Sequence, residues 1–89
     1  MDKYVVSYDL NKEGQKYSEL ITFLESFPDY VHVQKSYWFI KSSQSLDYIS
    51  KKIDSILDSN DEYLILNFDS HPTGKVADDV YQDLKRFLS

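Results

Sequence analysis

Four stretches of the chain have the hydrophobic pattern of β-strands. The first, residues 3–8, reads Lys-Tyr-Val-Val-Ser-Tyr and is followed by residues 9–14, whose Asp, Asn and Gly favour a turn. Residues 30–41 are β-like over a length that is long for one strand, with a polar interruption at 34–36. We therefore predict two strands, 30–34 and 37–41, joined by a tight turn, with one long bent strand as the alternative. Residues 62–68 form the last predicted strand.

Two stretches between these strands have apolar residues at helical spacing. The first predicts a helix near 16–27 that ends before Pro28, because proline disfavours helical geometry in the residue that precedes it. The second predicts a helix near 45–58, which begins after serine-rich residues that suit a helix N-cap. The apolar positions are Tyr17, Leu20, Ile21, Leu24 and Phe27 in the first helix, and Leu46, Ile49, Ile53, Ile56 and Leu57 in the second.

A third amphipathic stretch predicts a C-terminal helix within residues 74–88. Asp78 and Asp79 lie near its start, where the helix dipole favours negative charge. Lys85 and Arg86 lie near its end, where the dipole favours positive charge. Its apolar stripe consists of Val76, Val80, Leu84, Phe87 and Leu88.

The predicted order of elements is β-α-β-β-α-β-α, which contains the split βαβ plan of ferredoxin-like folds. We therefore expect an α+β protein with a four-stranded antiparallel sheet, a ferredoxin-like βαββαβ core over residues 3–69 and a C-terminal helical extension at 74–88. Right-handed crossovers would place the two main helices on one face of the sheet. No repeat or linker-like stretch divides the chain, so residues 1–89 are expected to form a single domain.

The first and last predicted strands are largely apolar on both faces. In residues 4–8 and 63–68, apolar side chains occupy odd and even positions alike. Strands with this pattern are covered on both sides. The C-terminal helix could cover the second face, or the sheet of a second copy could do so. Because a small core also gains from association, we expect a homodimer that buries aromatic residues of the sheet or of the C-terminal segment.

Composition narrows the range of partners and compartments. With 15 acidic and 10 basic residues, the formal net charge is −5, which disfavours the non-specific binding of nucleic acid. The absence of cysteine excludes disulfides and cysteine-based zinc sites and suits a reducing cytoplasm. No apolar run approaches the length of a membrane span and the first residues lack the pattern of a signal peptide. We therefore expect a cytoplasmic protein with no membrane partner.

The residue inventory excludes several kinds of catalytic site. Two histidines, His32 and His71, cannot build a histidine-rich metal cage within one chain, and we expect both to have structural or solvated roles. The chain has no Gly-x-Ser-x-Gly elbow for a serine nucleophile. It also has no glycine-rich phosphate loop, because Gly14 and Gly74 are its only glycines.

Aromatic residues raise the alternative of base stacking. A βαββαβ sheet with exposed aromatics is how RNA-recognition motifs bind bases, and this chain has eight tyrosines. Residues 36–40, Ser-Tyr-Trp-Phe-Ile, lack the basic and glycine-containing pattern that such motifs carry in their third strand. Tyrosine and tryptophan are equally typical of cores and protein interfaces, and we favour that interpretation.

Asp9 is the candidate for metal chemistry. It ends the first predicted strand and points into the loop before a helix, where aspartate also commonly serves as a turn or capping residue. Hard cations such as Mg²⁺ prefer carboxylate ligands. One carboxylate makes a poor site, but two that meet across a twofold axis would make one that can support phosphodiester hydrolysis.

Three stretches of the chain resemble a known family. Residues 5–10, Val-Val-Ser-Tyr-Asp-Leu, are similar to the opening strand of the small CRISPR-associated nucleases that act as adaptation partners of the CRISPR integrase. Residues 33–38, Val-Gln-Lys-Ser-Tyr-Trp, resemble the family's Val-Gln-x-Ser-Val-Phe stretch, with Ser36 at its serine and Trp38 at its phenylalanine. Residues 61–65 fit the acidic turn and strand that follow the second helix in the family. The virulence-associated toxin ribonucleases share this fold and are a neighbouring candidate.

The resemblance implies a ferredoxin-like homodimer in which two copies of Asp9 bind Mg²⁺ and act as the catalytic residues of an endonuclease. Tyr8, Ser36 and Trp38 would then be secondary or interface residues. The chain departs from the family in its acidic balance, its single arginine, Arg86, and His32 at a position where the family carries a basic residue. Two alternatives stay open: a catalytically silent dimeric protein-interaction module on the same fold, and an acidic inhibitor or nucleic-acid mimic.

Overall fold

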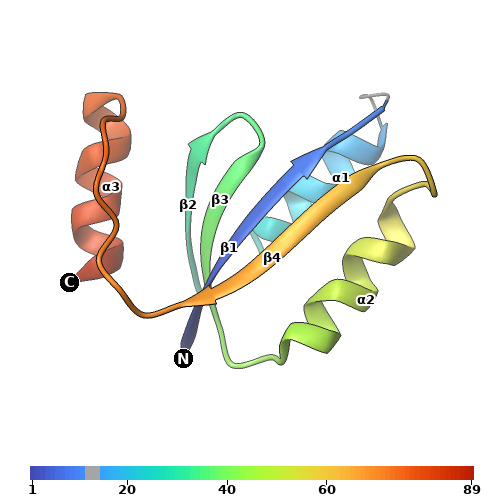
Figure 1. Cartoon of the computed structure of the whole chain (residues 1–89), viewed down its shortest axis with the longest axis horizontal. Helices are drawn as coiled ribbons and strands as arrows, with labels where there is room; N and C mark the ends of the chain where they lie inside the picture. Colours follow the sequence, from blue (N-terminus) through green and yellow to red (C-terminus); the bar gives the residue numbers. More distant parts are fainter. Residues whose placement is uncertain (12–14) are drawn as a thin grey trace.

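The computed structural model describes residues 1–11 and 15–89. Seven helices and strands alternate along these residues in the order that the hydrophobic pattern predicts (Figure 1). They are β1 (Asp2–Asp9), α1 (Gln15–Leu24), β2 (Asp29–Gln34), β3 (Tyr37–Ser42), α2 (Leu46–Ile56), β4 (Glu62–Phe68) and α3 (Asp78–Leu88).

The four strands form one antiparallel sheet in the order β2-β3-β1-β4. This confirms the predicted four-stranded antiparallel sheet and the α+β class. β2 and β3 are separate strands, with Gln34 opposite Tyr37 and a bulge between His32 and Gln34. The alternative of one long bent strand is therefore wrong, because the polar residues at 35 and 36 form the turn.

The helices begin and end at residues that their local chemistry explains. α1 ends at Leu24, earlier than predicted, and the chain turns through residues 25–28 before β2. Phe27 still lies in the core, so the apolar spacing is retained although the helix is not. At the start of α2, the Ser45 side chain accepts a hydrogen bond from the backbone N–H of Tyr48 at 3.1 Å, as an N-cap residue does.

α1 and α2 cover one face of the sheet. They bury leucine and isoleucine side chains against the even-numbered residues of β1 and β3, which alternation turns to this face. Trp38 in β3 is fully buried here. The fully or nearly buried members of this cluster are Tyr4, Val6, Tyr8, Leu20, Leu24, Phe27, Trp38, Ile40, Ile49 and Ile53.

α3 covers part of the opposite face within the same chain. Phe87 is fully buried and packs with Val31 of β2 and Phe39 of β3 in a second cluster. The Arg86 guanidinium donates to the Asp29 carboxylate of β2 at 2.8 Å, which ties the end of the helix to the sheet. In Figure 1, α3 stands beside β2 at one end of the molecule.

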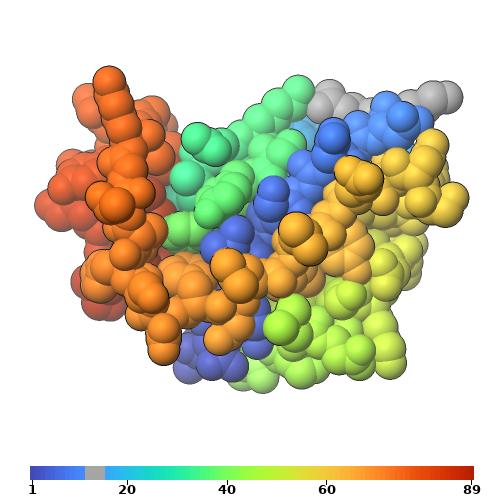
Figure 2. Space-filling view, viewed as in Figure 1, coloured from blue at the N-terminus to red at the C-terminus, as the bar shows by residue number. Residues whose placement is uncertain are grey.

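The β1–β4 half of this second face has no helix over it. Leu64 and Leu66 in β4 are 78% and 62% exposed, and they pair in register with Ser7 and Val5 of β1. Figure 2 shows β4 and part of β1 at the surface, away from α3. We call the surface formed by Val5, Ser7, Leu64 and Leu66 the open half of the sheet. Large exposed apolar side chains that lie side by side are typical of a contact surface.

Among the described residues, none of the helices has the length and hydropathy needed to cross a membrane.

Candidate functional site

Asp9 lies at the last position of β1, at the rim of the open half of the sheet. Its partner in the antiparallel register is Glu62, the first residue of β4, and both side chains are exposed. Opposite residues of an antiparallel pair share a face, so the two carboxylates are neighbours. They help to line a shallow hollow of about 560 Å³ that continues to Ser7 and Leu64.

The Asp9 side chain has no ion pair or hydrogen bond with any other residue that the structure describes. Its carboxylate is therefore available to a ligand or to a second copy of the chain. Asp9 lies at the end of the first strand, as the sequence predicts, and its role as a metal ligand stays a prediction.

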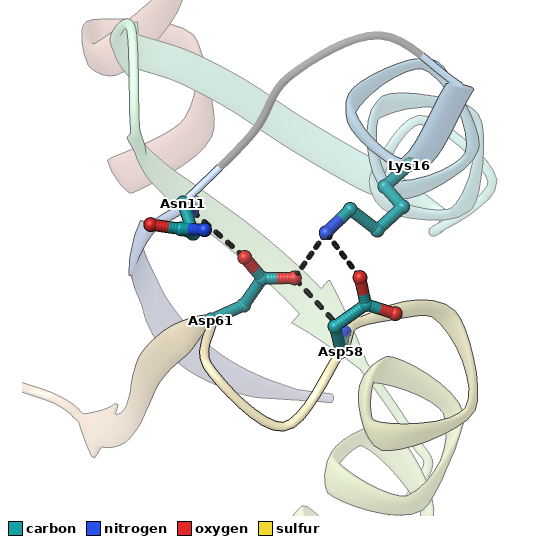
Figure 3. A network of polar contacts seen from close by, with 4 residues as sticks. All are labelled: Asn11, Lys16, Asp58 and Asp61. Carbon is teal, nitrogen blue, oxygen red and sulfur yellow. Dashed lines mark hydrogen bonds and ion pairs between the residues drawn. The ribbon is translucent and has the colours of Figure 1, made fainter.

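Asp61 lines the same hollow but is fully engaged within the chain (Figure 3). One carboxylate oxygen accepts from the backbone N–H of Asn11 at 2.8 Å. The other accepts from the Lys16 ammonium at 2.8 Å and from the backbone N–H of Asp58 at 2.9 Å. Lys16 also donates to the Asp58 carboxylate at 2.8 Å. We call these four residues the Asp61 network.

The Asp61 network joins three parts of the chain that are distant in sequence. It holds the segment after β1, the first turn of α1 and the turn before β4 against one another. The Lys16 ammonium and the two backbone donors lower the pKa of Asp61 from 3.8 to about 2. Hydrogen bonds to Asp58 and Asp61 raise the pKa of Lys16 in turn. The network therefore ties Asn11, two residues after Asp9, to the turn before β4.

The carboxylates fit a Mg²⁺ site only in part. Asp9 and Glu62 offer oxygen ligands of the type that Mg²⁺ prefers. The oxygens of Asp61 are occupied by three donors. Within the described ranges 1–11 and 15–89, no group of three or more Asp, Glu, His or Cys side chains is arranged to hold a metal ion. A carboxylate-rich site at this position would therefore need a second copy of the chain.

Of the residues expected to act as secondary or interface residues, Tyr8 and Trp38 meet on the helix-covered side of the sheet, and Ser36 lies in the turn between β2 and β3. The Trp38 indole Nε1–H donates to the Tyr8 hydroxyl at 3.1 Å, and that hydroxyl donates to the carbonyl of Lys35. The Ser36 carbonyl accepts from the backbone N–H of Tyr8 at 3.1 Å. Tyr8 and Trp38 are buried, so this arrangement anchors the β2–β3 turn beside the end of β1.

The two histidines lie apart from Asp9. The His32 ring stacks on Trp38 with a centroid separation of 3.9 Å, and its Nε2 lies 3.0 Å from the Lys35 carbonyl oxygen. His71 is exposed in the segment between β4 and α3. Neither ring lines the hollow at Asp9.

Sequence reasoning missed two features of this region. The first is the Asp61 network: residues 61–65 were interpreted as an acidic turn and strand, but the ion pair of Asp61 with Lys16 was not predicted. The second is the strong exposure of Leu64 and Leu66. The apolar character of both strand faces signalled that a cover was needed, but not which half of the sheet would lack one.

No protein-family model matches this chain, and no curated protein sequence matches it. The resemblance to the CRISPR-associated nucleases accordingly rests on the motif residues themselves.

Proposed function

We propose that the chain is a ferredoxin-like homodimer of the CRISPR-associated nuclease type, in which two copies of Asp9 bind Mg²⁺ and support cleavage of phosphodiester bonds in RNA or DNA. The strand order β2-β3-β1-β4, with α1 and α2 against one face, supports the ferredoxin-like part of this proposal. The position of Asp9 supports the part of the proposal that concerns a metal site shared by two copies. An exposed carboxylate without a partner among the described residues lies at the rim of an uncovered, leucine-containing sheet surface.

Association through the open half of the sheet would bury Leu64 and Leu66 of both copies. Asp9 lies on the same face, next along β1 after Ser7, so a twofold axis near this end of the strands brings both Asp9 carboxylates to one interface. Glu62 would accompany Asp9 in each copy. The shared site would then hold four carboxylates, two from each copy, whereas the described residues of one chain offer only the pair of Asp9 and Glu62.

In this proposal the chain's own residues bind and position the metal ion. Asp9, with Glu62 beside it, supplies the anionic oxygens, and the Asp61 network holds Asn11 against the turn before β4. Bound Mg²⁺ supplies charge neutralisation at the phosphodiester and a water of lowered pKa. The cation would also reduce the repulsion between the acidic site and a polyanionic substrate, which the net charge of −5 makes important.

Substitution of Asp9 by Asn tests the proposal, because Asn keeps the shape and removes the charge. Single- and double-stranded RNA and DNA are incubated with Mg²⁺ or Mn²⁺ and each protein. Wild type is expected to cleave at least one substrate, and Asp9→Asn is expected to lower the rate more than about 100-fold, since a direct ligand contributes more than outer-shell partners do. Asp69→Asn is the matched control, since Asp69 is exposed and outside the hollow.

The metal-free dimer gives an independent measurement. Two facing carboxylates repel each other without a cation, so the Asp9→Asn dimer is expected to dissociate less readily than wild type in a chelator. Equal cleavage by wild type and Asp9→Asn would contradict a catalytic role for Asp9. Failure of wild type to cleave any of the four substrates would remove the nuclease proposal.

A catalytically silent dimeric interaction module is the second candidate. The described part of one chain contains no group of three metal-ligating side chains, and the acidic balance opposes nucleic-acid binding. The same cleavage measurements separate the two functions. A dimer that forms through the open half of the sheet but has no Mg²⁺-dependent activity would support the interaction module.

A further inference from the structure

A second cavity lies on the other half of the same face, between α3 and the segment that leads to it. Residues 69–77, which we call the linker, contain no helix or strand and run from β4 alongside α3 (Figure 1). Figure 2 shows the linker as a ridge at the α3 end of the molecule. Between this ridge, α3 and the β2–β3 hairpin is a cavity of about 630 Å³, within the range of small-molecule sites.

The interior of this cavity is apolar. Its lining includes five side chains of the second hydrophobic cluster: Val33, Tyr37 and Phe39 of the sheet, and Leu84 and Leu88 of α3. The linker forms the outer wall of the cavity with residues 71–76. Gly74 is exposed, and a β-carbon added there would meet no atom within 4 Å.

The charged side chains that line the cavity are Lys75 from the linker and Lys85 from α3, and no Asp or Glu side chain contributes to the lining among the described residues. Lys85 and Tyr81 both line the cavity, and the Lys85 ammonium lies 5.7 Å from the Tyr81 ring centroid. Neither lysine has an ion pair with another described side chain. In a chain of net charge −5, the two lysines at this cavity are a local exception to the acidic balance.

We propose that this cavity binds a small amphiphile with an apolar body and a single anionic head group, such as a medium-chain carboxylate. The apolar body would lie against the floor formed by Phe39 and Leu84, and the head group would lie between Lys75 and Lys85. A concave apolar site with a few charges of one sign at its wall is the typical form of such a binding site. The cavity is separate from Asp9, so this proposal does not depend on the nuclease proposal.

The probe is sodium decanoate, used below its micelle-forming concentration and followed by amide chemical shifts of the labelled protein. We expect saturable shifts in the linker and in α3, with a dissociation constant of about 0.1–1 mM for a ligand of this size. Amides of Leu64 and Leu66 should not shift. Decyltrimethylammonium has the same apolar chain with a cationic head and is expected to bind at least about tenfold more weakly, because it meets Lys75 and Lys85.

Two double variants distinguish the charge contribution from non-specific adsorption. Lys75→Gln with Lys85→Gln should weaken decanoate binding about threefold to thirtyfold, as expected for two exposed ion pairs. Lys51→Gln with Lys52→Gln changes the net charge equally on α2, away from the cavity, and should leave binding unchanged. All four lysines are exposed, so the fold should be retained.

Three results would overturn the proposal. The first is equal binding of decanoate and the cationic probe, which would mark simple hydrophobic adsorption. The second is a set of shifts centred on the open half of the sheet. The third is loss of shift dispersion throughout the second hydrophobic cluster, which would mean that the detergent-like chain displaces α3 rather than occupying the cavity.

Discussion

At the scale of single residues, two carboxylates that line one hollow have opposite surroundings. Asp61 is enclosed and accepts from two backbone N–H groups and from Lys16. Asp9 is exposed and has no partner among the described residues. A carboxylate that already has three donors stabilises the fold in its ionised form, whereas an unengaged one can serve a ligand. This difference assigns Asp61 to loop structure and leaves Asp9 as the candidate for chemistry.

The first residue-scale prediction concerns the stability of Asp61→Asn as a function of pH. Folding holds the pKa of Asp61 near 2, below its ordinary value of 3.8. The ionised carboxylate therefore favours the folded state above about pH 4, and this contribution disappears as pH falls towards 2. Urea unfolding should show that Asp61→Asn is less stable than wild type at pH 7, and that the two proteins converge between pH 4 and pH 2.

Asp69→Asn serves as the control, because Asp69 is exposed after the end of β4 and makes no contact with the Asp61 network among the described residues. Its unfolding should follow wild type at every pH. If Asp61→Asn differed from wild type by the same amount at pH 7 and pH 2, the effect would come from shape rather than from charge, and the assigned role of the carboxylate would be wrong.

At the scale of helices and strands, local pattern predicted the order of elements because period-2 and helical spacing are properties of a few neighbouring residues. The last strand was predicted with the bounds that the structure has, Glu62–Phe68. The end of α1 was not, because Phe27 continues the apolar spacing and remains in the core although the helix has ended at Leu24. Apolar spacing reports which residues are buried, and helix ends depend also on turns such as that at 25–28.

The sequence left open whether the C-terminal helix α3 covers the second face of the sheet, because both sheet faces were apolar. The structure shows that it covers β2 and β3, and this choice rests on contacts across the fold, such as the ion pair of Arg86 with Asp29, 57 positions away. No local pattern contains that information. The same limit applies to the Asp61 network, whose bonds to Lys16 and Asn11 span 45 and 50 positions.

The element-scale prediction concerns the attachment of α3 through Phe87. This side chain is fully buried against Phe39, with a ring-centroid separation of 5.9 Å, and Phe87→Ala should cost about 3–5 kcal/mol of packing free energy. Because α3 is a peripheral element, we expect the loss to appear as local opening. Hydrogen exchange of residues 78–88 should accelerate strongly, while β1 and β3 keep most of their protection.

Tyr81→Ala provides the comparison on the same helix. Tyr81 is 53% exposed, and its truncation should change stability by no more than about 0.5 kcal/mol. Uniform loss of protection in β1, β3 and α3 of Phe87→Ala would show instead that α3 and the sheet unfold as one unit.

At the scale of the whole molecule, the sheet has one covered face and one divided face. α1 and α2 complete the first core, whereas α3 leaves the β1–β4 half of the second face uncovered. Sequence reasoning recognised that the second face needed a cover and named two candidates, the C-terminal helix and a second copy. α3 supplies part of that cover, and the second copy stays a prediction for the remaining half.

The last prediction tests this association directly. Leu64→Lys with Leu66→Lys places two charges on the open half of the sheet, and we expect wild type to sediment at twice 10.5 kDa and the variant at 10.5 kDa. Burial of a leucine contributes about 1.5–3 kcal/mol, and a symmetric dimer buries two from each copy, so dimerisation should weaken more than about 100-fold. Leu46→Lys, an exposed leucine on α2, should leave the dimer intact. Because Leu64 and Leu66 are exposed in one chain, the variant should keep the unfolding midpoint that wild type shows at concentrations too low for association. A variant that remains dimeric would place the interface elsewhere, and a wild type that is monomeric at high micromolar concentration would remove the twofold site at Asp9 together with the dimer.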